Sequence, residues 1–198
     1  MNPPFEKLFA SLAARIRSYG IAINLERIEI ETAGKFDGLS ITINPDHDLE
    51  ARCYYLAHSF GSIVEWSLEY EAAKHVFGEL RAAKKSRDTQ PERFEHALDR
   101  FCAFENVASE YAVWLLADIG YPDVVCRYTE FFRADLDSMR IYHREGTAPP
   151  WPAFFVDWKE SVARGDRKVT RFTPRPVPPF TPVLIREQEV VQERDGEP

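Results

Sequence analysis

The residues best suited to chemistry lie in two segments about fifty positions apart. The first contains His58, Ser59, Ser62 and Glu65, and the second contains Glu105. At about 100° of rotation per helical residue, His58, Ser62 and Glu65 share a face opposite the main apolar stripe, so we expect that face to be solvated. Glu105 lies within an apolar stripe, where a carboxylate needs a partner or must become neutral. The buried acid is therefore a candidate site residue.

Hydropathy and breaker residues predict the elements that position these groups. Asp48 is an acceptable N-cap for the helix that holds His58. Pro91 suits the first turn of the helix that holds Glu105, and Gly146 suits the stop of the next one. The expected elements are a helix over 5–19, a strand over 21–30 with an irregularity at 26–27, a turn over 35–38, a strand over 39–43, a helix over 49–68 that continues or kinks up to 85, and helices over 94–119, 123–144 and 153–164.

The segments around the candidate residues resemble the ImmA/IrrE-type zincin-like metallopeptidases. In that family a strand ending in Ile-x-Asn leads into a helix with the pattern L-A-H-E-L-G-H, and a later helix carries E-x-x-A-N-x-F-A-x-x-L-L. The matching segments here are 41–44 (ITIN), 56–62 (LAHSFGS) and 105–116 (ENVASEYAVWLL). The resemblance covers about residues 5–120. It implies an α+β, zincin-like fold: a small N-terminal antiparallel or mixed sheet followed by a helical bundle, with an extended proline-rich tail.

The departures from this pattern fall on the family's chemistry. His58 and Glu105 keep two of the three zinc-ligand positions, whereas the second histidine is replaced by Ser62 and the general-base glutamate by Ser59. A neutral hydroxyl is a poor zinc ligand, and a serine does not deprotonate the attacking water as the glutamate does. We therefore expect no catalytic residue, no cofactor and no bound zinc, and a direct or water-bridged contact between His58 and Glu105 across a vestigial site.

Three functions remain open on this evidence. The first is a catalytically degenerate peptidase-like protein that acts as a binding or regulatory module for a protein or peptide. The second is an active metal-dependent hydrolase whose site is rebuilt from His58, Glu105 and an auxiliary ligand, either Glu65 or His47. The third is a structural or assembly protein that forms a homodimer through its C-terminal tail.

Composition narrows the classes of partner and compartment. The 198 residues carry 25 Lys and Arg against 32 Asp and Glu, a net charge of −7, which argues against nucleic-acid binding. No apolar run approaches the ~20 residues of a membrane span, so no membrane association is expected. The three cysteines show no CxxC spacing, and the first twenty residues lack a basic segment before their apolar positions. These features predict a cytoplasmic protein with buried, structural Cys53 and Cys102.

Proline placement divides the chain into a domain over 1–146 and an extension over 147–198. The extension contains a short helix and a basic, proline-rich segment, including Arg175-Pro-Val-Pro-Pro-Phe180, which favours polyproline II. One interpretation is a docking segment for an aromatic groove on a partner. The other is an arm packed on its own acidic body or on a second subunit. We favour packing, because five apolar residues are available for burial: Phe172, Phe180, Val183, Leu184 and Ile185.

Overall fold

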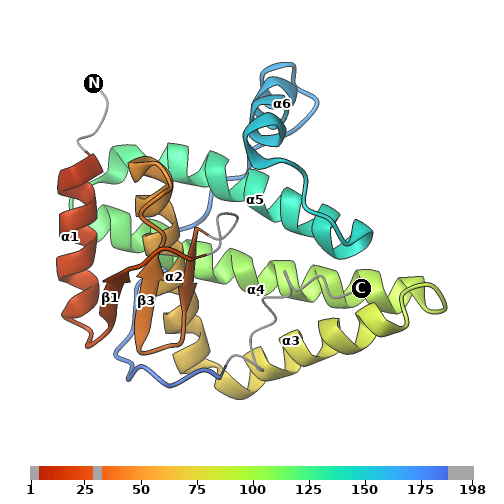
Figure 1. Cartoon of the computed structure of the whole chain (residues 1–198), viewed down its shortest axis with the longest axis horizontal. Coiled ribbons are helices and arrows are strands. Elements are labelled where there is room, and N and C mark those ends of the chain that lie inside the picture. The colour runs from red at the N-terminus through yellow and green to blue at the C-terminus, as the bar shows by residue number, and fades with distance from the viewer. Residues whose placement is uncertain (1–4, 29–32, 187–198) are drawn as a thin grey trace.

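The computed structural model describes residues 5–28 and 33–186, which form a helix-rich α+β fold with a small mixed sheet (Figure 1). The elements are α1 (Phe5–Arg17), β1 (Ala22–Leu25), β2 (Gly34–Phe36), β3 (Ser40–Ile43), α2 (Leu49–Leu68), α3 (Tyr70–Lys85), α4 (Pro91–Asp118), a 3₁₀ turn (Pro122–Val124), α5 (Val125–Glu145) and α6 (Trp151–Ala163). No helix in these two ranges combines the length and apolar character needed to cross a bilayer.

The sheet has the order β1-β3-β2, with β1 parallel and β2 antiparallel to β3. The first strand is shorter than predicted, since it ends at Leu25, and the predicted positions 29–30 lie outside the described residues. The predicted turn over 35–38 is wrong in its first half, because β2 includes positions 35 and 36. The turn itself follows, and the Asp37 carboxylate accepts hydrogen bonds from the backbone N–H groups of Leu39 and Ser40. A three-residue strand is too short to show a period, so β2 left no signal in the sequence.

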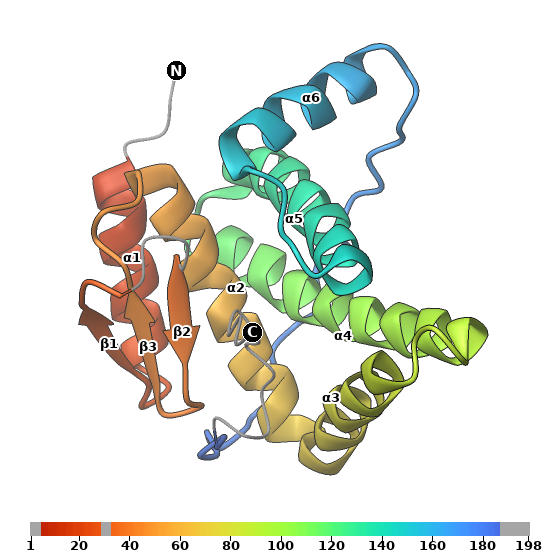
Figure 2. The same ribbon diagram turned by 45° about the vertical axis from the view of Figure 1, so that its right-hand side comes forward.

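Helix α2 is the central element of the molecule and is covered on several sides (Figure 2). Its first turn is capped by Asp48, as predicted, since the Asp48 carboxylate accepts a hydrogen bond from the Ala51 N–H at 2.9 Å. It contacts α1, α3, α4, β2 and β3. The predicted kink is a complete break at Glu69, after which α3 begins.

The remaining helices follow the predicted boundaries closely. Pro91 opens α4, which ends at Asp118, and α5 ends at Glu145, followed by Gly146 as a left-handed C-cap with φ of 81°. Helix α6 packs on α5 and projects from the rest of the fold (Figures 1 and 2). The sequence predicted 153–164 for this helix, and the structure places it two residues earlier at its start.

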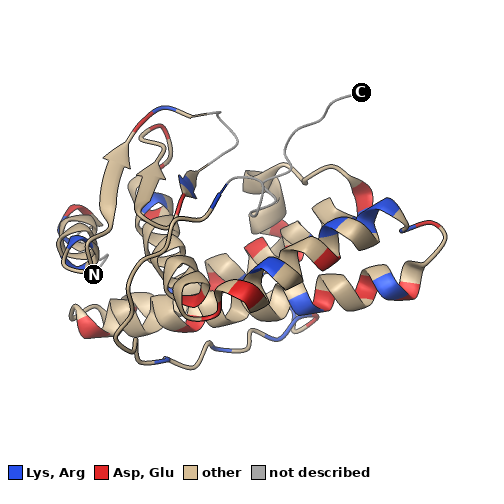
Figure 3. Ribbon diagram, turned by 90° about the horizontal axis from the view of Figure 1, so that it is seen from below, with Lys and Arg blue, Asp and Glu red and all other residues tan. Residues whose placement is uncertain are grey.

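The extended segment over 164–186 packs on the body of its own chain. Phe172 and Ile185 are buried, and Phe180 stacks on Tyr19 with 5.4 Å between ring centroids. Arg175 pairs with Glu110 at 3.2 Å, and in Figure 3 the first part of the segment runs along the lower edge of the molecule with several basic positions on it. Of the other apolar residues expected to be buried, Phe180 and Val183 are half-buried, and Leu184 is 56% exposed, because it alternates with the inward-facing Ile185.

Candidate functional site

Helices α2 and α4 approach each other closely where Gly61 meets Ala108. A Cβ atom added to Gly61 would lie 2.0 Å from the carbonyl oxygen of Ala108, so any larger residue there forces the helices apart. This contact lies one turn from His58 on α2 and one turn from Glu105 on α4. The glycine therefore sets the spacing at which side chains from the two helices can meet.

His58 and Glu105 form a direct contact at this crossing. The His58 Nε2 and Glu105 Oε2 atoms are 2.9 Å apart, and each side chain is 12% exposed. The contact that we expected from the sequence is present, and it provides the partner that a buried carboxylate requires.

The other side of the His58 ring is also held by the protein. Its Nδ1 atom lies 3.3 Å from the Tyr128 hydroxyl and 3.4 Å from the Ser109 hydroxyl, and the ring stacks on Phe132 with 4.1 Å between centroids. Burial raises the pKa of Tyr128 well above its usual value, so this phenol stays protonated and can donate to Nδ1. In the tautomer that carries its ring proton on Nε2, the imidazole donates to Glu105.

The Ser109–His58–Glu105 arrangement has the order of a hydrolytic triad, but it is enclosed. Ser109 is fully buried, and its hydroxyl donates to the backbone carbonyl of Glu105 at 3.1 Å. A nucleophile must reach a substrate carbonyl, which this hydroxyl does not. The geometry therefore supports a structural polar network rather than serine hydrolysis.

The expectation of a solvated face on α2 is wrong. Of the residues on that face, Ser62 and Glu65 are buried, with 3% and 6% exposure, and the His58 side chain is 12% exposed. The reason is that α4 packs on the face that carries these residues while other elements cover the rest of α2. The Ser62 hydroxyl donates to the carbonyl of His58 at 3.2 Å, so it bonds within its own helix rather than to the Glu105 carboxylate.

Glu65 is the most perturbed acid of this region. Burial, reinforced by the negative charge of Glu105, raises its pKa to about 9, so the carboxyl is neutral at pH 7. Its Oε2 atom has no hydrogen-bond partner among the described residues. In the described part of the chain no three His, Cys, Asp or Glu side chains are grouped so as to hold a metal ion.

The other residues considered from the sequence lie apart from the His58–Glu105 contact. His47 lies between β3 and α2, where its Nε2 atom is enclosed without a hydrogen-bond partner among the residues described. It is not grouped with His58 and Glu105 as a possible metal-ligand set in the described ranges. Cys53 and Cys102 are buried as predicted, and burial raises their pKa values to about 12 and about 11, which keeps both thiols protonated.

Sequence reasoning missed the partners of the His58 Nδ1 atom. Ser109 lies four residues after Glu105, so the helical period could have placed both on one face. Tyr128 and Phe132 share the same spacing on α5, but that helix lies outside the resemblance, and helical periodicity alone does not say which neighbour it packs against.

A double-mutant cycle measures how strongly the buried pair is coupled. We expect His58→Ala and Glu105→Ala to show a coupling energy of about 1–3 kcal/mol in urea unfolding at pH 7, because each single change leaves a buried polar group without its partner. The control cycle uses Glu71 and His75, an exposed pair on α3 with i, i+4 spacing, which should couple by less than about 0.5 kcal/mol. Equal coupling in the two cycles would contradict the interpretation.

Comparison with known proteins adds no identification. No family model matches the chain, and neither the curated proteins nor the solved structures contain a significant match.

Proposed function

We propose that this chain is a degenerate relative of the ImmA/IrrE-type zincin-like metallopeptidases that acts as a binding or regulatory module. The observation that carries the proposal is the 2.9 Å contact between His58 and Glu105. These are the two retained ligand positions of the resemblance, and they come together from helices whose residues are 47 positions apart in sequence. The order of a strand, the His58 helix and a later Glu105 helix also agrees with the family pattern.

The side chains present do not fit the family's zinc ion. The imidazole and the carboxylate bond to each other, and the hydroxyl at the third ligand position donates within its own helix. Position 59 carries a buried serine in place of the base. Zinc sites use imidazole, thiolate or carboxylate ligands, and three protein ligands are needed in a catalytic site. The proposed function therefore excludes peptide hydrolysis by the family's mechanism.

The alternative of a rebuilt hydrolase receives less support. Its auxiliary ligand would be Glu65 or His47. Among the described residues, neither side chain is grouped with His58 and Glu105 in a set that could hold a metal ion. The assembly alternative also receives less support. Its C-terminal segment contacts its own chain, through Phe180 on Tyr19 and through Arg175 on Glu110.

Restoring the family ligands tests the proposal. We expect the unmodified protein, purified with zinc in the medium and then desalted, to retain less than about 0.1 zinc per chain. A variant with Ser59→Glu and Ser62→His should retain about one zinc per chain, because His58, the new histidine and Glu105 would complete a three-ligand site. Atomic absorption gives the metal content, and circular dichroism reports whether the variant is folded.

Two further variants separate the outcomes. Adding His58→Ala to the restored protein should abolish zinc retention, whereas the single variant Ser59→Glu should bind none. Stoichiometric zinc in the unmodified protein would favour the hydrolase alternative. A folded restored variant that gains no zinc would show that the two helices do not form a former metal site.

A further inference from the structure

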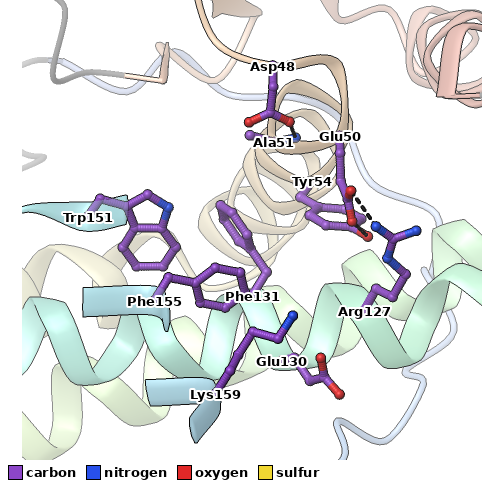
Figure 4. Close-up of a pocket in the computed structure, with 10 residues that line it drawn as sticks. All are labelled: Asp48, Glu50, Ala51, Tyr54, Arg127, Glu130, Phe131, Trp151, Phe155 and Lys159. Atoms are coloured by element: carbon purple, nitrogen blue, oxygen red, sulfur yellow. Dashed lines mark hydrogen bonds and ion pairs between the residues drawn. The ribbon is translucent and has the colours of Figure 1, made fainter. Parts of the chain in front are cut away.

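A second region with binding features lies at the N-terminal end of α2. A pocket of about 230 Å³ opens there between α2, α5 and α6 (Figure 4). None of its lining residues belongs to the group formed by His58, Ser59, Ser62 and Glu105. The pocket is thus a separate feature of the molecule.

One wall of the pocket is aromatic. The rings of Trp151 and Phe155 stack with 5.3 Å between centroids and 10° between planes, and Phe131 meets Trp151 edge-on at 5.0 Å. Tyr54 continues the wall at 5.4 Å from Phe131. Trp151 and Phe155 are only half-buried, so ring surface remains accessible to a ligand. The faces of such rings attract cations.

The opposite rim contains one ion pair that is already satisfied. Glu50 accepts a hydrogen bond from the Tyr54 hydroxyl at 2.7 Å and another from Arg127 at 2.5 Å. Both carboxylate oxygens of Glu50 are therefore occupied, and its charge is balanced by Arg127. This pair supplies a rigid edge rather than a group that a ligand can use.

The remaining charges leave the pocket acidic. Asp48 and Glu130 contribute two carboxylates against the single ammonium group of Lys159. Asp48 uses one oxygen to cap α2, and Lys159 places its Nζ atom 5.5 Å from the ring centroid of Phe155. The chain thus already holds one cation against the aromatic wall, on an exposed and flexible side chain.

We propose that this pocket binds the cationic side chain of an arginine or lysine in a peptide partner. The ligand's aliphatic stem would lie on Trp151 and Phe155, and its charged head would face Glu130, displacing the ammonium group of Lys159 (Figure 4). The volume is below the ~300–1,000 Å³ of sites for small molecules and cofactors, which suits one side chain. The inference gives the proposed binding function a class of partner, but it rests on residues outside the His58–Glu105 site.

The test uses three blocked amino acids as probes, with the Trp151 indole N–H resonance as the readout. N-acetyl-arginine amide should shift this resonance with saturation at millimolar concentrations, whereas N-acetyl-norleucine amide and N-acetyl-glutamate amide should bind at least about fivefold more weakly. Glu130→Gln should weaken arginine binding by about threefold to tenfold, since it removes a carboxylate that has no ion-pair partner among the described residues. Lys159→Met should tighten it by about twofold to fivefold, because the competing ammonium group is gone.

Glu160→Gln is the matched control, because it removes the same charge from an exposed position on α6 outside the pocket. It should leave arginine binding unchanged within about twofold. Equal binding of the norleucine probe, preference for the glutamate probe, no binding of any probe, or no effect of Glu130→Gln would overturn the proposal. None of these results depends on zinc, so the metal experiment and this one fail independently.

Discussion

Replacing Gly61 with alanine is expected to lower the free energy of unfolding by at least about 3 kcal/mol. The added Cβ would lie 2.0 Å from the carbonyl oxygen of Ala108, and the contacted atom is helix backbone, which cannot rotate away as a flexible side chain can. Helices α2 and α4 must therefore separate. The separation would also lengthen the contact between His58 and Glu105. Urea unfolding followed by circular dichroism measures the first effect, and the His58 ring resonances report the second.

Gly78→Ala is the control for this change. Gly78 lies within α3, and a Cβ atom there would meet nothing within 4 Å. Alanine is a better helix former than glycine, so this variant should be more stable by about 0.5–1 kcal/mol. A loss below about 1 kcal/mol for Gly61→Ala would show that the two helices can move apart at little cost.

Glu65→Gln is expected to change how stability depends on pH. The pKa of Glu65 is raised to about 9 in the folded protein, against 4.5 for an ordinary glutamate. Between these two values the unfolded chain has lost the proton and the folded protein retains it, so the stability of the unmodified protein falls as pH rises. Glutamine resembles the neutral carboxyl in shape and does not titrate. The variant should therefore gain about 2–4 kcal/mol relative to the unmodified protein between pH 5 and pH 8.

Unfolding free energies at pH 5, 6.5 and 8 test this prediction. Glu92→Gln, at an exposed position in the first turn of α4, serves as the control and should shift stability by less than about 0.5 kcal/mol at every pH. If the difference between Glu65→Gln and the unmodified protein stayed constant over this range, Glu65 would not be a neutral buried acid.

The sequence predicted three helix boundaries well because each has a chemical marker. Asp48, Pro91 and Gly146 all lie where the structure begins or ends a helix. The contact between His58 and Glu105 followed from a resemblance and from the need of a buried carboxylate for a partner.

What could not be predicted was the environment of α2. Helical periodicity identifies the most apolar face of a helix, but it does not show that a second helix covers the opposite face. Ser62 and Glu65 are buried because α4 packs there, and the small Gly61 and Ala108 allow that packing. The Tyr128 hydroxyl beside the His58 Nδ1 atom comes from α5, whose place beside α2 depends on tertiary contacts that no local pattern records.

The C-terminal segment has a consequence for the order in which the molecule is assembled. The backbone N–H of Ile185 donates to the carbonyl of Asp37 at 2.8 Å, so a residue made late in synthesis closes onto one made early. Contacts between such distant positions form slowly, because a long loop must close first. On the ribosome, the ring surfaces of Tyr19 and Phe60 that later receive Phe180 therefore stay uncovered after the helices have emerged. During that interval the nascent chain exposes an aggregation-prone apolar surface of the type that chaperones shield.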